Sequence, residues 1–171
     1  MTQRKQRAHD ASAGFTLMEV MISSALSVMV LVVALTIFVS AMKDWRNIDV
    51  RMLADREVNL AMSAMVYGMG DRLGLRSAWT GSMTTNVTAN GWTLTYAAMK
   101  NSAFQTNTIT YSSAASNLVI TPGPIVVGKD IAYAPCPSIG ARLLCVTLRV
   151  DRVEGPIKAS RQIWTSVTWR N

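Results

Sequence analysis

The chain has 171 residues, of which 50% are hydrophobic, and its 17 Lys and Arg against 10 Asp and Glu give a formal net charge of +7. Its single histidine, His9, and its two cysteines are too few to make a tetrahedral metal site. No glycine-rich phosphate-binding pattern is present, so nucleotide chemistry is not indicated.

The chain opens with a short basic leader followed by a long apolar run. The leader, residues 1–14, carries Arg4, Lys5 and Arg7, and residues 20–42 contain no charge. With a rise of about 1.5 Å per residue, a helix of this length spans the hydrocarbon core of a bilayer, which is about 30 Å thick. Because positive charge resists translocation, we expect the leader to stay in the cytoplasm and the carboxyl-terminal part to cross.

Two simpler interpretations explain only part of this segment. A secretory signal peptide has an apolar core of about 7–15 residues and then a small-residue cleavage site, whereas this run is longer and passes directly into Lys43 and Asp44. A plain signal anchor accounts for length and orientation but not for Glu19 at the start of the run. A carboxylate near membrane depth costs roughly 2.5–3.5 kcal/mol, so its presence suggests a role.

Residues 14–23 read Gly-Phe-Thr-Leu-Met-Glu-Val-Met-Ile-Ser. With the basic leader and the apolar run, this string resembles the class III signal of the type IV pilin family. That signal is a leader ending in glycine, then Phe-Thr-Leu-aliphatic-Glu, then a hydrophobic helix. Met18 stands where an aliphatic residue is commoner. The resemblance covers residues 1–42, and it extends to both pilins and pseudopilins.

The resemblance implies that a prepilin peptidase cuts between Gly14 and Phe15 and that the new amino group of Phe15 is methylated. It also implies that Glu19 meets the amino terminus of a neighbouring subunit and so sets the register between subunits. Opposite charges about 4 Å apart attract by roughly 4 kcal/mol at an effective dielectric constant near 20. Alternatively, Glu19 lies at headgroup level in the first helical turn, where negative charge suits the helix dipole.

Helical spacing continues beyond the apolar run. Trp45, Ile48 and Met52 keep intervals of three and four. A looser apolar face continues through Leu53, Leu60, Ala61, Ala64 and Met65, and the pattern ends where glycines begin at Gly68. We therefore expect one helix over about residues 15–67, whose second half is amphipathic and packs on the globular part.

From about residue 71, Thr, Ser, Asn and Gly become frequent and the apolar period shortens to two. Strands are expected at 91–96, 108–111, 118–120, 125–128, 144–153 and 162–170. Residues 112–117 read as a hairpin loop, and Ile163, Thr165, Val167 and Trp169 as one side of the last strand. A single antiparallel sheet packed on the helix, an α+β fold, explains this order.

These expectations divide the chain into three parts. They are a cleaved cytoplasmic leader (1–14), a long helix (15–70) with a transmembrane or filament-core part (20–42) and an amphipathic part (43–70), and a globular, β-rich periplasmic domain (71–171). The hairpin Ile-Thr-Tyr … Asn-Leu-Val and the ending Thr-Ser-Val-Thr-Trp-Arg-Asn resemble minor pilins and the larger minor pseudopilins.

Cys136 and Cys145 both lie in the part expected outside the cytoplasm. The periplasm is oxidising, so a disulfide is permitted. It would close a short loop and stabilise the fold by about 3 kcal/mol in the loop-entropy model. Two buried free thiols are the alternative, and we favour the disulfide.

Enzyme chemistry is not indicated. His9 lies in the leader, and the many Ser and Thr have no base to activate them. Asp151 and Glu154 straddle a probable turn, where solvation explains them better than catalysis. We therefore expect a protein that is not an enzyme and that needs no metal and no cofactor.

Residues 71–171 carry ten Lys and Arg against four acids. Arg149, Arg152, Lys158 and Arg161 converge near one expected hairpin and could meet DNA, although a solvated basic surface is the favoured interpretation.

By resemblance, the expected function is that of a minor pilin or pseudopilin. It would reside in the cytoplasmic membrane as a single-pass protein and then join other subunits in a type IV pilus or a type II secretion pseudopilus, which it would initiate or cap. The alternatives are a DNA-uptake pseudopilin with a basic DNA-binding surface and a membrane-anchored binding protein outside any filament.

Overall fold

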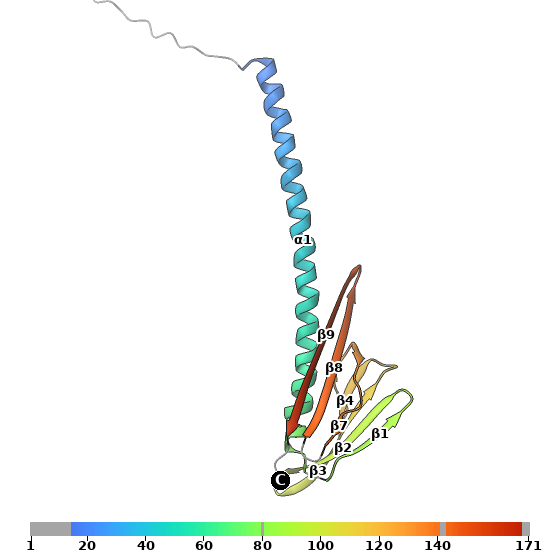
Figure 1. Ribbon diagram of the computed structural model, residues 1–171. Coiled ribbons are helices and arrows are strands. Elements are labelled where there is room, and N and C mark those ends of the chain that lie inside the picture. Colours follow the sequence, from blue (N-terminus) through green and yellow to red (C-terminus); the bar gives the residue numbers. More distant parts are fainter. Residues whose placement is uncertain (1–14, 80, 141–142, 169–171) are drawn as a thin grey trace, which may run out of the picture. The chain divides into compact units, whose positions relative to one another are not determined.

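The computed structural model describes residues 15–79, 81–140 and 143–168. In these ranges the chain has an α+β fold, with one long helix followed by antiparallel strands (Figure 1). The elements are α1 (Leu17–Tyr67), a single 3-10 turn η1 (Leu75–Ser77), β1 (Thr84–Thr88), β2 (Gly91–Lys100), β3 (Ala103–Ser112), β4 (Asn117–Thr121), β5 (Ile125–Gly128), β6 (Ile131–Tyr133), β7 (Ser138–Ile139), β8 (Leu143–Glu154) and β9 (Ile157–Thr168). The α+β prediction is confirmed.

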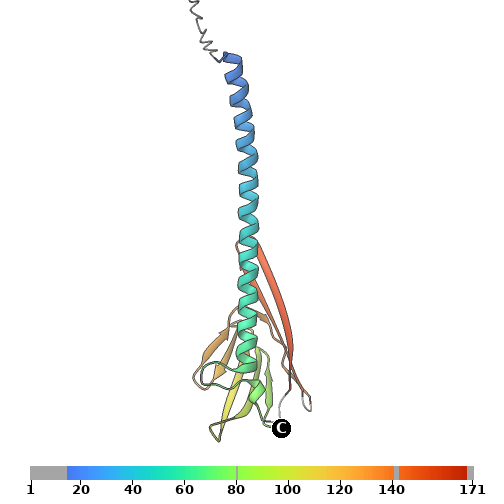
Figure 2. The same ribbon diagram turned by 90° about the vertical axis from the view of Figure 1, so that its left-hand side faces the viewer.

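The chain separates into two compact units, Met1–Asp44 and Trp45–Asn171. The second unit includes the second half of α1, which is therefore part of the globular body. Figure 2 shows the last turns of α1 lying over the strands.

Helix α1 ends where the sequence predicts. Gly68 follows Tyr67 with a φ of +91°, a left-handed conformation that glycine adopts readily, and its N–H donates to the carbonyl of Ala64 at 3.0 Å. This bond satisfies one of the last carbonyls of the helix, and the chain then turns toward the first strands.

The helix face that packs on the sheets agrees only in part with the one the sequence suggests: Ala61, Ala64 and Met65 are buried as expected, whereas Leu60 is exposed. Trp45, Ile48 and Met52, which mark the apolar spacing, are 72%, 54% and 65% exposed. Most of the buried residues are small, with two methionines among them: Val50, Ala54, Val58, Ala61, Met62, Ala64 and Met65. Alanine and valine let the helix axis approach a sheet closely, so the larger apolar residues at 45, 48 and 52 did not mark the buried face.

The strands form two sheets, where the sequence suggested one. The first is an antiparallel meander in the order β1-β2-β3-β4-β5, and the second pairs β8 with β9 on one side and with β6 and β7 on the other. The chain leaves the first sheet at Asp130, whose positive φ of 56° turns the backbone between β5 and β6. The short strands β1, β6 and β7 were not predicted, because two to five polar or mixed residues carry too little alternation to be recognised.

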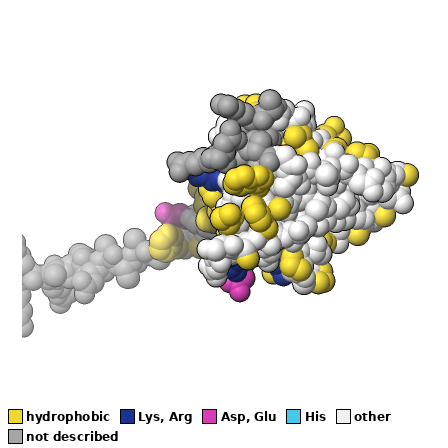
Figure 3. Space-filling model, turned by 90° about the horizontal axis from the view of Figure 1, so that it is seen from below, with side chains coloured by type: hydrophobic (Ala, Val, Ile, Leu, Met, Phe, Trp, Pro, Cys, Tyr) yellow, Lys and Arg dark blue, Asp and Glu magenta, His cyan; other side chains and the backbone are white. Residues whose placement is uncertain are grey.

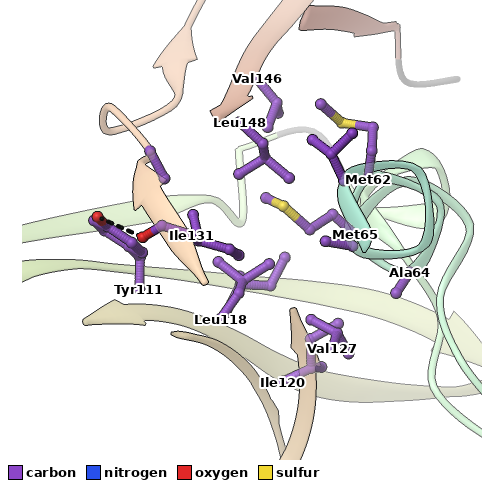
Figure 4. Close-up of a cluster of buried hydrophobic side chains, with 14 of the residues drawn as sticks. Met62, Ala64, Met65, Tyr111, Leu118, Ile120, Val127, Ile131, Val146 and Leu148 are labelled. Carbon is purple, nitrogen blue, oxygen red and sulfur yellow. Dashed lines mark hydrogen bonds between the residues drawn. The ribbon is translucent and has the colours of Figure 1, made fainter. Parts of the chain in front are cut away.

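The core lies between the second half of α1 and the inner faces of both sheets. Met62 and Met65 of α1 meet Leu118 of β4, Ile131 of β6 and Leu148 of β8 (Figure 4). Buried polar atoms of aromatic residues find partners within this layer. Trp92 Nε1 donates to the carbonyl of Ala134 at 2.7 Å, and the Tyr96 hydroxyl donates to the carbonyl of Leu73 at 2.8 Å. The body is thus a closed unit with its own core.

Candidate functional site

The first half of α1 is the largest unpaired apolar surface in the described chain. Every residue from Phe15 to Arg46 is exposed. This part of α1 is long and apolar enough to cross a membrane by length and composition. Apolar area left in water costs roughly 25 cal/mol per Å², so the segment needs either lipid or other apolar helices around it.

Four of the five hydroxyl side chains within residues 20–42 donate hydrogen bonds to the helix itself; Ser23 is the fifth. The hydroxyls of Ser24, Ser27 and Ser40 donate to backbone carbonyls three or four residues earlier at 2.8–2.9 Å. Thr36 Oγ1 donates to the carbonyl of Val32 at 2.6 Å. These hydroxyls need no water as a hydrogen-bond partner. The segment therefore suits the interior of a bilayer or of a helix bundle, where no water is present.

Thr16 and Glu19 define the start of the helix. The backbone N–H of Glu19 donates to Thr16 Oγ1 at 3.3 Å and to the Thr16 carbonyl at 3.0 Å, and Glu19 is the acidic residue of the first turn. Threonine followed three positions later by glutamate is the sequence signature of a helix amino-terminal capping box. Thr16 was not singled out from the sequence, although this spacing was the signal that could have identified it.

Glu19 is also the only charged residue of α1 before Lys43. Its position in the first turn agrees with a favourable interaction with the helix dipole. That local role and an interaction with a second subunit do not exclude one another, since a carboxylate can accept several hydrogen bonds.

Of the two expected processing residues, the structure describes Phe15, which precedes α1 and is 77% exposed. Gly14 lies outside the described residues, as does His9.

Both cysteines are free thiols in the structure, Cys136 half-buried and Cys145 exposed. Cys145 on β8 lies opposite Ser138 on β7, and Cys136 is two residues before Ser138. Cys136 therefore lies just before β7, the strand that pairs with the part of β8 that holds Cys145. Their oxidation to a disulfide stays a prediction.

The arginines of the β8–β9 hairpin are paired with carboxylates. Arg149 forms two hydrogen bonds to Asp151, each 2.9 Å long. These bonds, with one from Ser160, lower the pKa of the Asp151 carboxyl. Asp151 thus serves as an ion-pair partner.

Two further pairs extend from this hairpin. Arg161 Nε lies 2.6 Å from Asp55 Oδ1 of α1, and Arg152 lies 3.8 Å from Asp130. Three of the four residues proposed for DNA contact therefore already have an acidic neighbour, which reduces the positive field of this surface.

Within the described ranges, no group of three His, Cys, Asp or Glu side chains is placed to hold a metal ion. A hollow of about 520 Å³ lies between the end of α1, η1 and β9. It is lined by Val66, Tyr67, Arg76, Ser77 and residues 165–168, and the Arg76 guanidinium stands 5.8 Å from the centre of the Tyr67 ring. Its chemistry is that of a cation on an aromatic face with hydroxyls around it, and no residue there is poised as a nucleophile with a base.

Models of protein families, curated proteins and solved structures give no match to this chain.

Proposed function

We propose that this protein is a minor pilin or pseudopilin, a subunit that is trimmed after Gly14 and then assembled with related subunits through the first half of α1. One observation carries the proposal. The first half of α1, long enough to cross a membrane and exposed along its whole length, begins at a threonine-capped turn that holds a single carboxylate, directly after the proposed cleavage site. A simple anchor needs the apolar length but neither the carboxylate nor the glycine.

The assembly step exchanges one apolar environment for another. In the membrane, lipid covers residues 20–42, and in a filament the same side chains pack against equivalent helices. This packing has little directionality, because dispersion and apolar burial do not specify a register. Glu19 supplies the register by pairing with the amino group of Phe15 in a neighbouring subunit.

The decisive experiment is the mass of the amino-terminal peptide of the protein recovered from native membranes. We expect a chain that begins at Phe15 and carries one added methyl group. A chain that still begins at Met1 would instead indicate a membrane-anchored binding protein outside any filament, and a chain that begins beyond Met42 would indicate a secretory signal peptide.

The minor role has its own test. A subunit that initiates or caps a filament is present in far fewer copies than the main subunit. We expect co-purification with other pilin-like chains in substoichiometric amounts. Equal or greater abundance relative to every partner would assign it the role of a main subunit.

A further inference from the structure

The outer face of the first sheet is uncharged. From Ser77 to Gly128 the only Lys, Arg, Asp or Glu is Lys100. Its ammonium group lies 3.2 Å from Asp71, next to the loop after α1. Ordinary protein surfaces carry about 25% or more charged residues, so an extended sheet face without any is unusual. In Figure 3 the side of the body on which β1 and β2 lie in Figure 1 is white and yellow, without the charged colours.

Hydroxyl groups stand in register across this face. Side chains directly opposite one another on paired strands share a face, and the alternate residues Trp92, Leu94 and Tyr96 of β2 point into the core. The outward row nearest the middle of the sheet crosses four strands: Thr84, Thr95, Thr108 and Thr121. The next row is Asn86, Thr93, Thr110 and Val119.

Two hydroxyls of the first row contact one another, and a third bonds to the backbone of a neighbouring strand. Thr95 Oγ1 and Thr108 Oγ1 are 3.4 Å apart, and Thr121 Oγ1 donates to the carbonyl of Thr108 at 3.4 Å. Each hydroxyl has one donor and two acceptor sites, so every threonine of the row keeps capacity for a further partner. Neighbouring strands are about 4.8 Å apart, and rows repeat at about 6.8 Å along a strand. The face is thus a regular two-dimensional array of neutral hydrogen-bonding groups.

An aromatic pair borders this array. Phe104 lies opposite Met99 in the β2–β3 register, and Trp79 packs edge-on against Phe104 with ring centres 5.8 Å apart. Trp79, Met99 and Phe104 are 51%, 52% and 59% exposed. The backbone N–H of Trp79 donates to the carbonyl of Ala97 at 2.8 Å, and this bond holds the residue beside β2. Large aromatic surface is left in water here, at the end of the hydroxyl rows.

We propose that this outer face, which we call the threonine face (the two rows above with Trp79, Met99 and Phe104), binds a neutral, extended polysaccharide. A sugar ring offers an apolar face for aromatic side chains and hydroxyls at its rim for threonine and asparagine. The absence of charge suits such a partner, because no ion has to be desolvated without compensation. A protein partner fits less well, since protein interfaces have an apolar centre and a polar rim, whereas here the apolar groups lie at one end.

The inference concerns the second compact unit alone, and it goes beyond the assembly role proposed above. It gives the subunit an adhesive surface made from an element that filament packing through residues 20–42 does not use. Its test needs no filament and is independent of the identity of the mature amino terminus.

The test is a depletion assay with the full chain in a non-glycosidic detergent. Amorphous cellulose and chitin, both neutral and β-linked, are the two probes, and their comparison tells which sugar is preferred. We expect either polymer to remove the protein from solution, with little change between low and high salt, because no phosphate-like charge takes part. No depletion by either polymer would overturn the proposal.

Substitutions on and away from the threonine face show whether this face is where the polysaccharide binds. The double variant Trp79→Ala with Phe104→Ala should weaken binding about tenfold, a typical loss for truncated aromatic contacts. The pair Thr95→Val and Thr108→Val keeps the β-branched shape while removing two hydroxyls, and it should also weaken binding. Matched controls are Trp164→Ala, a 75% exposed tryptophan on β9, and Thr165→Val beside it. Both controls should bind as the unaltered chain does.

Two results would count against the threonine face. One is an equal loss of binding in Trp164→Ala, which would show that any exposed tryptophan suffices. The other is a change in oligomeric state in Trp79→Ala with Phe104→Ala, which would show that a second copy of the chain occupies this face. Circular dichroism spectra that match the unaltered chain establish that each variant is folded.

Discussion

At the scale of single residues, Thr16 and Glu19 allow two explanations of one carboxylate to be separated. The Glu19 N–H bonds to Thr16 Oγ1, so a helix cap alone accounts for a threonine and a glutamate at this spacing. A helix cap acts within a single chain, whereas the register between subunits involves two chains, so different variants can test the two roles.

We therefore expect Glu19→Ala to be processed normally and to lose co-purification with partner subunits, because an unpaired amino terminus would remain in an apolar bundle. Thr16→Ala removes the capping hydroxyl and keeps the carboxylate, so it should be processed and should still assemble. Amino-terminal mass and pull-down yield measure the two steps separately. Equal assembly defects in both variants would assign Glu19 to helix capping, and normal filaments from Glu19→Ala would remove the register argument.

Tyr96 connects β2 to the loop after α1 within the buried core. Its hydroxyl donates to the Leu73 carbonyl at 2.8 Å, and burial raises its pKa well above the usual value near 10. Folding therefore keeps this phenol neutral at a pH where the unfolded chain would ionise. Stability contributed in this way is complete below about pH 10 and falls as the pH rises further.

Tyr96→Phe should lower the free energy of unfolding by about 1–3 kcal/mol at neutral pH, because the Leu73 carbonyl loses its partner. It should also flatten the decline in stability between about pH 10 and 12. Tyr133→Phe, at a 53% exposed position, is the control and should change neither quantity. Denaturant unfolding at several pH values measures both, and an unchanged alkaline slope in Tyr96→Phe would contradict the assignment.

At the scale of elements, the helix end depends on glycine. A Cβ on Gly68 would meet the Arg72 carbonyl oxygen and stand 2.7 Å from the Gly74 nitrogen, in addition to the strain of its positive φ. Gly70 also has a positive φ, of +63°, yet a Cβ there would meet nothing within 4 Å. Both glycines have a positive φ, but only Gly68 has backbone atoms close by. Comparing the two positions therefore separates the effect of the close contact from the effect of the backbone conformation.

We expect Gly70→Ala to cost about 1–2 kcal/mol, the usual penalty of a left-handed alanine. Gly68→Ala should cost about 1–3 kcal/mol more, because the turn after α1 must open to admit the methyl group. Thermal or urea unfolding in detergent measures the difference. Equal costs at the two positions would mean that the turn adjusts freely and that the close approach has no structural importance.

The elements also show what could be predicted from the sequence. The period-two alternation of β2, β3, β8 and β9 and the glycine after Tyr67 are strong local signals, and each of these elements overlaps the range expected for it. Strand β2 continues to Lys100, and β3 and β9 begin at Ala103 and Ile157, earlier than expected; Trp169 lies outside the described residues. The buried face of α1 could be read from spacing only near the end of the helix, at Ala61, Ala64 and Met65. Small Val50, Ala54 and Val58 are buried, whereas the larger Trp45 and Met52 are not, because the distance between helix and sheet is decided by tertiary packing.

The candidate functional residues were likewise predicted only in part from the sequence. Glu19 and Phe15 were found because a string of residues resembles a known signal, and such a string is visible without a structure. The rows of the threonine face were not found, since they depend on the register among four strands. That register brings Thr84 beside Thr95, and Thr108 beside Thr121, across three strand pairings.

At the scale of the whole molecule, the boundary between the two compact units is testable. The second unit begins at Trp45, and its core includes Val50, Ala54 and Val58 of α1. A chain starting at Trp45 should therefore fold in water with an unfolding midpoint close to that of the full chain in detergent. A chain starting at Asp71 lacks the helix contribution and should remain unfolded or aggregate.

Circular dichroism and denaturant titration distinguish these outcomes. Folding of the chain from Asp71 would show that the two sheets close a core without α1. Failure of the chain from Trp45 would show that residues before it stabilise the body, although none of the residues from Phe15 to Asp44 has a buried side chain.

The hydroxyls of Ser24, Ser27, Thr36 and Ser40 all bond to carbonyls of their own helix. A neighbouring helix running alongside would consequently meet a mostly hydrocarbon surface there, on which the Ser23 hydroxyl is the exception. Rotation about the long axis, or sliding by one turn, would meet little resistance until the carboxylate near the tip came into range. Such a filament could stretch or twist under load while a single ionic contact per subunit returned it to its resting alignment.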